Sequence, residues 1–148
     1  MTTDIDGPPP QPEVNAHVAS CVIRVSNLER SVTFYRDVFS CQVGLHDKDM
    51  ALVLTPTGFQ LYLHAQRSVR RRSAGTLGVS YLMWATDSQS DLDLITGRLR
   101  AYDPAVFTHT ENGVTFLEGV DPDGRRIIVA SPSPRQLPRT IIAERLRG

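Results

Sequence analysis

Three side chains of the sequence are of types that move protons between a protein and a bound molecule. Tyr62 and His64 are two positions apart in a strand-like segment, so a strand would place them on one face. An imidazole changes charge near neutral pH, and a carboxylate such as Glu118 can accept a proton. These residues are therefore the candidates for acid–base catalysis. A purely structural role for each of them stays open.

A repeated pattern organises the segments that would position these side chains. Residues 20–27 run from Ser20 through an apolar stretch to a helix start, and residues 80–87 do the same from Ser80. Each copy is followed by a turn, at residues 55–58 and at the Asp-Pro-Asp-Gly sequence of residues 121–124, which leads into a further strand. A repeat of this length predicts two copies of one supersecondary unit.

Each copy contains one predicted helix. Ser26 followed by Glu29 is a capping-box pattern, and the helix after it has an apolar face made by Leu28, Val32, Tyr35 and Phe39. In the second copy Asp87 is the predicted cap, and the buried face is made by Leu92, Ile95 and Leu99.

Short strands are predicted between and after these helices. Asn112 and Gly113 form a tight-hairpin signal, because both residues tolerate positive φ. The prediction is an α+β fold with two βαβββ modules, whose curved sheets enclose a cavity. Besides the first strand of each copy, the predicted strands are residues 42–46, 50–55, 59–64, 105–110, 114–118 and 126–130.

Strand alternation divides the side chains between a face beneath the helices and a face lining the cavity. The helix-side set is Cys21, Ile23, Val25, Leu61, Leu63, Tyr81, Met83, Ala85, Ile127 and Val129. The cavity-side set is Ser20, Val22, Arg24, Gln60, Tyr62, His64, Ser80, Leu82, Trp84, Arg126, Ile128 and Ala130. The cavity-side set mixes apolar, aromatic and polar groups, as small-molecule sites do. A half-solvated outer sheet face is the alternative.

These motifs resemble the vicinal-oxygen-chelate superfamily of glyoxalase I, extradiol dioxygenases, and bleomycin- and fosfomycin-resistance proteins. The resemblance rests on residues 25–39 and the Asp-Pro-Asp-Gly turn, and it covers roughly residues 16–133. In metal-dependent members, His, Glu or Gln occupy the positions that align with Ser20, Tyr62, Ser80 and Ile128. These four residues do not form a divalent-metal ligand set, so no metal or other cofactor is expected.

Composition indicates one domain with short extensions. The chain has 148 residues and zero formal net charge, which favours neither nucleic acid nor an anionic membrane as a partner. No membrane span or secretory segment is present, so a cytoplasmic location with reduced Cys21 and Cys41 is expected. We expect residues 1–15 to be a disordered tail and residues 16–133 to be the domain, with modules at about 16–66 and 77–133. Residues 134–148 are predicted to be a tail with a possible short helix. We expect a homodimer, for which the apolar residues of this tail offer surface. The role of the arginine-rich loop at residues 67–72 stays open.

Two functions are compatible with this sequence. The first is metal-independent binding, by sequestration or carriage, of a hydrophobic and aromatic small molecule, as bleomycin-resistance proteins do. The ligand-binding residues would be Ser20, Val22, Arg24, Gln60, Tyr62, His64, Ser80, Leu82, Trp84 and Ile128. The second is a metal-free isomerase, cyclase or hydrolase that uses His64, Tyr62 or Glu118. A metalloenzyme with relocated ligands ranks third. Neither a nucleophile-elbow serine nor a phosphate-binding glycine loop is present.

Overall fold

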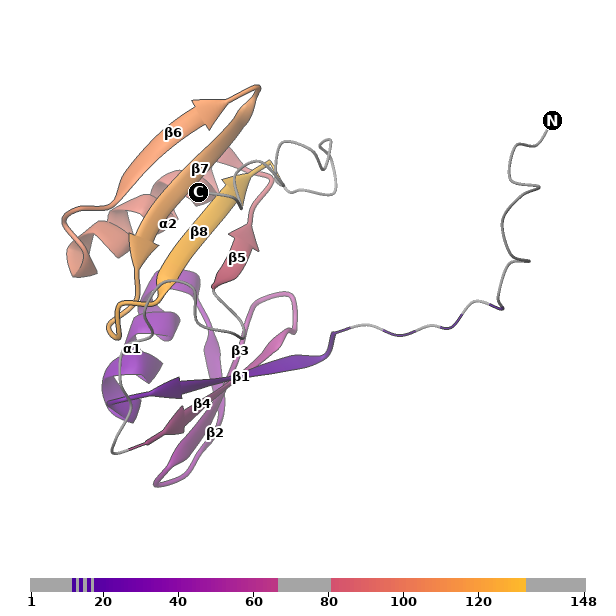
Figure 1. Cartoon of the computed structure of the whole chain (residues 1–148), viewed down its shortest axis with the longest axis vertical. Helices are drawn as coiled ribbons and strands as arrows, with labels where there is room; N and C mark the ends of the chain where they lie inside the picture. Colours follow the sequence, from indigo (N-terminus) through magenta and orange to yellow (C-terminus); the bar gives the residue numbers. More distant parts are fainter. Residues whose placement is uncertain (1–11, 13, 15, 17, 67–80, 133–148) are drawn as a thin grey trace, which may run out of the picture.

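The computed structural model describes residues 12, 14, 16, 18–66 and 81–132. These residues form two successive βαβββ modules (Figure 1). The first contains β1 (Ser20–Val25), α1 (Leu28–Phe39), β2 (Gln42–His46), β3 (Met50–Leu54) and β4 (Gln60–Ala65). The second contains β5 (Leu82–Ala85), α2 (Gln89–Tyr102), β6 (Phe107–Glu111), β7 (Val114–Val120) and β8 (Arg126–Ser131). The predicted α+β class and the internal repeat are confirmed.

Each module forms one four-stranded mixed sheet. Sheet A has the strand order β1-β4-β3-β2, and sheet B has the order β5-β8-β7-β6. The first strand of each module pairs in parallel with the last, and the remaining pairs are antiparallel. This order leaves β1 and β5 at the edges of their sheets, where one side of each strand has no neighbouring strand of its own sheet.

Each helix begins directly after a polar residue whose side chain caps it. Asn27 caps α1 by accepting a hydrogen bond from the backbone N–H of Arg30, and Ser88 caps α2 in the same way. The predicted caps, Ser26 and Asp87, are each one residue too early. The side chain of Ser26 instead bonds to Asp123 in the other module.

The apolar helix faces pack in one shared core. Leu28, Val32, Tyr35 and Phe39 of α1 are all buried, as their spacing predicts. They pack with the helix-side residues of both sheets and with Leu92 and Leu99 of α2. The hairpin between β6 and β7 also forms as predicted, with positive φ at Asn112 and Gly113.

The assignment of side chains to faces is correct for β1, β4 and β8 but wrong for β5. Leu82 and Trp84 pack against the helix-side core, whereas Tyr81 and Met83 pack on the opposite face with Ile128. The strand pairing explains the reversal. Met83 is paired with Ile128, so both side chains lie on the face away from the helices, in the same way as the paired Val22 and Tyr62 of the first module. In the second module, Met83 therefore holds the position that Val22 has in the first.

Several predictions concern residues outside the described part of the chain. They include Ser80, the arginine-rich loop at residues 67–72, most of the 1–15 tail, and the 134–148 tail with its dimer surface. Within the described segments, neither helix is long and apolar enough to span a bilayer.

Candidate functional site

A pocket lies at the junction of the two modules. Its cavity volume is about 820 Å³. One wall is formed by the end of α1 and by the turn between β3 and β4, and the other by β5 and α2. The apolar lining residues are Val38, Phe39, Pro56, Phe59, Leu61, Leu82, Met83, Trp84, Ala85, Leu94 and Ile95. The pocket is thus mainly apolar, and it contains two of the predicted ligand-binding residues, Leu82 and Trp84.

Trp84 forms the aromatic part of this pocket. Its ring stacks on Phe39 with centroids 3.8 Å apart and an interplanar angle of 10°. Phe39 is in turn stacked on Tyr35. The buried indole N–H of Trp84 has no hydrogen-bond partner among the described residues. The last residues of α1 thus hold the indole ring in a defined orientation.

Polar groups also line the pocket. Thr86, Asp87, Ser88 and Asp91 come from the segment that enters α2 and from its first turn. Thr55 and Thr57 come from the turn between β3 and β4. Arg98 donates a 3.0 Å hydrogen bond to the Ser40 hydroxyl, and both residues line the pocket. A bound molecule would therefore meet hydrogen-bonding groups as well as apolar surface.

Six other predicted binding residues lie elsewhere, on the face of sheet A that points away from the helices: Ser20, Val22, Arg24, Gln60, Tyr62 and His64. Strand register places Val22, Tyr62, Leu52 and Leu45 in one apolar row across all four strands. Val22 and Leu45 are 59% and 61% exposed, so this face is open. Ser20 and Arg24 are also exposed, whereas Gln60, Tyr62 and His64 are half-buried. Ile128 lies on the corresponding face of sheet B and is fully buried.

Glu118 belongs to a polar cluster on sheet B that the sequence analysis missed. It is only 7% exposed, accepts a hydrogen bond from Arg126 at 3.1 Å, and lies 2.9 Å from His109 Nε2. Arg126 stacks over the Tyr81 ring. The cluster results from the register of β6, β7 and β8. Phe107 is paired with Glu118, and His109, two residues further along β6, lies on the same face as Phe107. His109 could have been found only by predicting that register.

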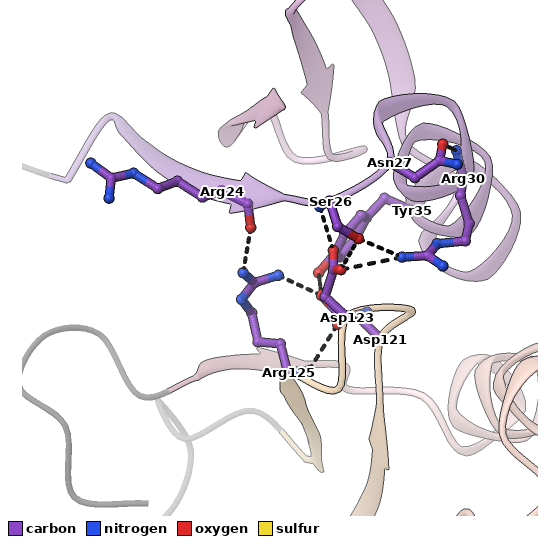
Figure 2. A network of polar contacts seen from close by, with 8 residues as sticks. All are labelled: Arg24, Ser26, Asn27, Arg30, Tyr35, Asp121, Asp123 and Arg125. Carbon is purple, nitrogen blue, oxygen red and sulfur yellow. Dashed lines mark hydrogen bonds and ion pairs between the residues drawn. The ribbon is translucent and has the colours of Figure 1, made fainter. Parts of the chain in front are cut away.

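A second polar network joins the modules (Figure 2). The buried Asp121 carboxylate accepts hydrogen bonds from the Tyr35 hydroxyl at 2.8 Å and from the Arg125 guanidinium at 2.6 Å. Arg125 also donates to the backbone carbonyl of Arg24 at 2.8 Å. Asp123 bonds to Ser26 at the start of α1. The Asp-Pro-Asp-Gly turn thus fastens the second module to the first and fixes the geometry of the pocket between them.

We expect this protein to lose stability in alkaline solution. Burial raises the pKa of the Cys41 thiol from its ordinary value of 9.0 to about 11, and burial next to Asp121 raises the pKa of Tyr35 well above 10. Above pH 9 the unfolded chain therefore releases protons that the folded chain keeps, so the stabilising contribution is present below pH 9 and is lost as pH rises. Urea denaturation at pH 8 and pH 10 should show a smaller loss for Cys41→Ala than for Cys21→Ala or the unmodified protein. Equal losses in all three would contradict this expectation.

The residues at the superfamily's metal positions do not fit a metal. The observed pairing of β5 with β8 makes Met83 equivalent to Val22, so the residue equivalent to Ser20 in the second module is Tyr81 and not Ser80. Ser20, Tyr62, Tyr81 and Ile128 offer three hydroxyl groups and one alkyl chain, which are poor ligands for zinc, nickel or iron. Among the described residues, no group of three or more His, Cys, Asp or Glu side chains could hold a metal ion.

Comparison with solved structures identifies the fold. A glyoxylase/bleomycin resistance protein/dioxygenase domain from Frankia sp. EAN1pec superimposes with a TM-score of 0.71 at 18% identity, over 81% of this chain and 100% of that one. A lactoylglutathione lyase from Agrobacterium tumefaciens gives 0.62 at 21% identity, over 80% and 96%. A fosfomycin resistance protein from Mesorhizobium loti gives 0.61 at 10% identity, over 84% and 98%. The fold is that of the vicinal-oxygen-chelate superfamily. No protein-family model or curated protein matches the sequence.

Proposed function

We propose that this protein binds a small, largely apolar molecule with an aromatic group, without the help of a metal ion, in the pocket between its modules. The observation that carries the proposal is the pocket itself, which has a mainly apolar lining, an indole ring stacked on Phe39 and several polar lining groups. Small-molecule sites have volumes of roughly 300–1,000 Å³ and this kind of mixed lining. Within the described segments, Val22 and Leu45 on the face of sheet A are 59% and 61% exposed, so that face is more open than the pocket.

The fold supports this proposal without specifying a ligand. One similar structure is named for bleomycin resistance together with glyoxylase and dioxygenase, and another for fosfomycin resistance. Proteins named for drug resistance and proteins named for enzymes therefore share this fold, and the residues of each site decide what each protein does. The unsuitable residues at the metal positions favour binding here.

A thermal-shift screen of aromatic compounds tests the proposal. A ligand that binds only the native state raises the midpoint of unfolding, by an amount equivalent to about 2.7 kcal/mol at a hundred times its dissociation constant. We expect such ligands to give the same shift with and without a chelator. A shift that requires a divalent metal would contradict the proposal.

The polar cluster of sheet B favours metal-free catalysis as a second candidate function. Glu118 holds the His109 imidazole in a fixed orientation, as carboxylates do for catalytic histidines. Here His109 and Glu118 would transfer protons. The other predicted catalytic candidates, His64 and Tyr62, lie on sheet A and not in this cluster of sheet B. Ligands recovered from the thermal-shift screen can be analysed by mass spectrometry, since chemical conversion that is lost in Glu118→Gln would favour the enzyme.

A further inference from the structure

The pocket faces the edge of β5 rather than one of its two faces. Residues 82–88 line the pocket without interruption. Successive side chains of a strand point to opposite sides, so a pocket against one face would be lined by every second residue only. Continuous lining means that the backbone itself borders the cavity.

The hydrogen-bonding groups on this edge can be identified. The backbone N–H of Thr86 donates to the carbonyl of Ala130 in β8 at 3.0 Å. Backbone groups alternate in direction along a strand, so those of Leu82 and Trp84 also point toward β8, and those of Met83 and Ala85 point away from it. In the described part of the chain, β8 is the one strand that pairs with β5. The N–H and C=O groups of Met83 and Ala85 are therefore directed toward the pocket.

We propose that the ligand is an extended, amide-bearing molecule, a short peptide or a peptide-like compound, that adds to β5 as an outer strand. This inference rests on the proposed binding function and names its ligand class. Strand addition obtains affinity from main-chain hydrogen bonds and specificity from pockets for alternate side chains. β5 has four residues at about 3.3 Å each, which matches a ligand of three to four residues. Alternate apolar side chains of the ligand would contact Trp84 and Leu82.

Matched peptides test the role of the ligand's amides. One probe is a blocked tetrapeptide with alternating threonine and phenylalanine residues, and its control is the same peptide with every backbone amide N-methylated. Two hydrogen bonds at about 0.5–1.5 kcal/mol each predict that the unmethylated peptide binds about tenfold more tightly. Equal affinities would overturn the inference.

The protein side of the same contact is tested by Ala85→Pro. Proline removes the N–H that points to the pocket and leaves the ladder to β8 intact, since proline is tolerated at outward positions of edge strands. The lost N–H would donate to a ligand carbonyl, so a folded variant should bind the unmethylated peptide about threefold to tenfold more weakly than the unmodified protein does. Unchanged affinity of the folded variant for this peptide would contradict the inference. 2-Naphthol, which has no amide, is the control ligand for the unmodified protein.

Two further outcomes keep the proposals distinguishable. If 2-naphthol binds but the peptides show no preference, the ligand class is wrong and the binding function stands, whereas failure of all three probes overturns both. Amide hydrogen exchange gives a readout that does not depend on the folding of Ala85→Pro. The amides of Met83 and Ala85 should exchange more slowly with the peptide bound. Protection of these amides in a peptide-free dimer would place a second copy on this edge and overturn the inference.

Discussion

Replacement of Asp121 with alanine should lower the free energy of unfolding by about 3–5 kcal/mol, the range for a buried ion pair that loses one partner. The Asp121 side chain is fully buried and accepts hydrogen bonds from Tyr35, from Arg125 and from two backbone N–H groups of its own turn. Its removal leaves the Arg125 guanidinium and the Tyr35 hydroxyl without their acceptor between the modules. Urea denaturation measures the effect.

Two variants calibrate that result. Tyr35→Phe removes one hydroxyl group and keeps the ion pair, so it should cost about 1–2 kcal/mol. Asp37→Ala removes two exposed contacts, a pair with Arg36 in which both side chains are about half exposed and a hydrogen bond from the Tyr102 hydroxyl, and it should cost about 1 kcal/mol. If Asp121→Ala costs no more than Asp37→Ala, the turn does not hold the modules together.

Replacement of Trp84 with alanine should weaken the binding of an aromatic ligand by roughly 1–3 kcal/mol, or about fivefold to 150-fold in dissociation constant. The reason is the loss of the aromatic wall of the pocket. Trp84→Phe can keep an aromatic ring against Phe39 and removes an indole N–H that has no partner in the part of the chain that the structure describes. It should therefore remain folded and bind with an intermediate affinity. Isothermal titration calorimetry of the folded variants measures these differences.

Tyr62→Ala provides the matched control for Trp84→Ala. Tyr62 lies on the open face of sheet A, outside the pocket, so its removal should leave affinity unchanged within about twofold. A large effect of Tyr62→Ala together with a negligible effect of Trp84→Ala would move the binding site to the sheet face.

Much of the fold could be predicted because its signals are local. The helical spacing of Leu28, Val32, Tyr35 and Phe39 requires a single buried face, and Asn112 with Gly113 permits the positive φ of a tight hairpin. The internal repeat then extends one module to two. These features depend on neighbours in the sequence, and the structure has all of them.

The site was less predictable because its contacts depend on strand phase and register. Residues 81–85 are all apolar or aromatic, so alternation cannot show which of them face the helices. The repeat alignment from Ser80 assigned Trp84 to the wrong face, and only the pairing of β5 with β8 reveals its place beside Phe39. The contact between His109 and Glu118 likewise arises from the β6–β7 register, to which the sequence gives no local signal.

Mapping of chemical-shift changes by NMR during titration with an aromatic ligand tests the central claim most directly. The account predicts that the largest changes occur at Leu82, Trp84 and Ile95, around the pocket, with little change at Tyr62 and His64. Changes centred on Tyr62 and His64, with none at Trp84, would contradict it.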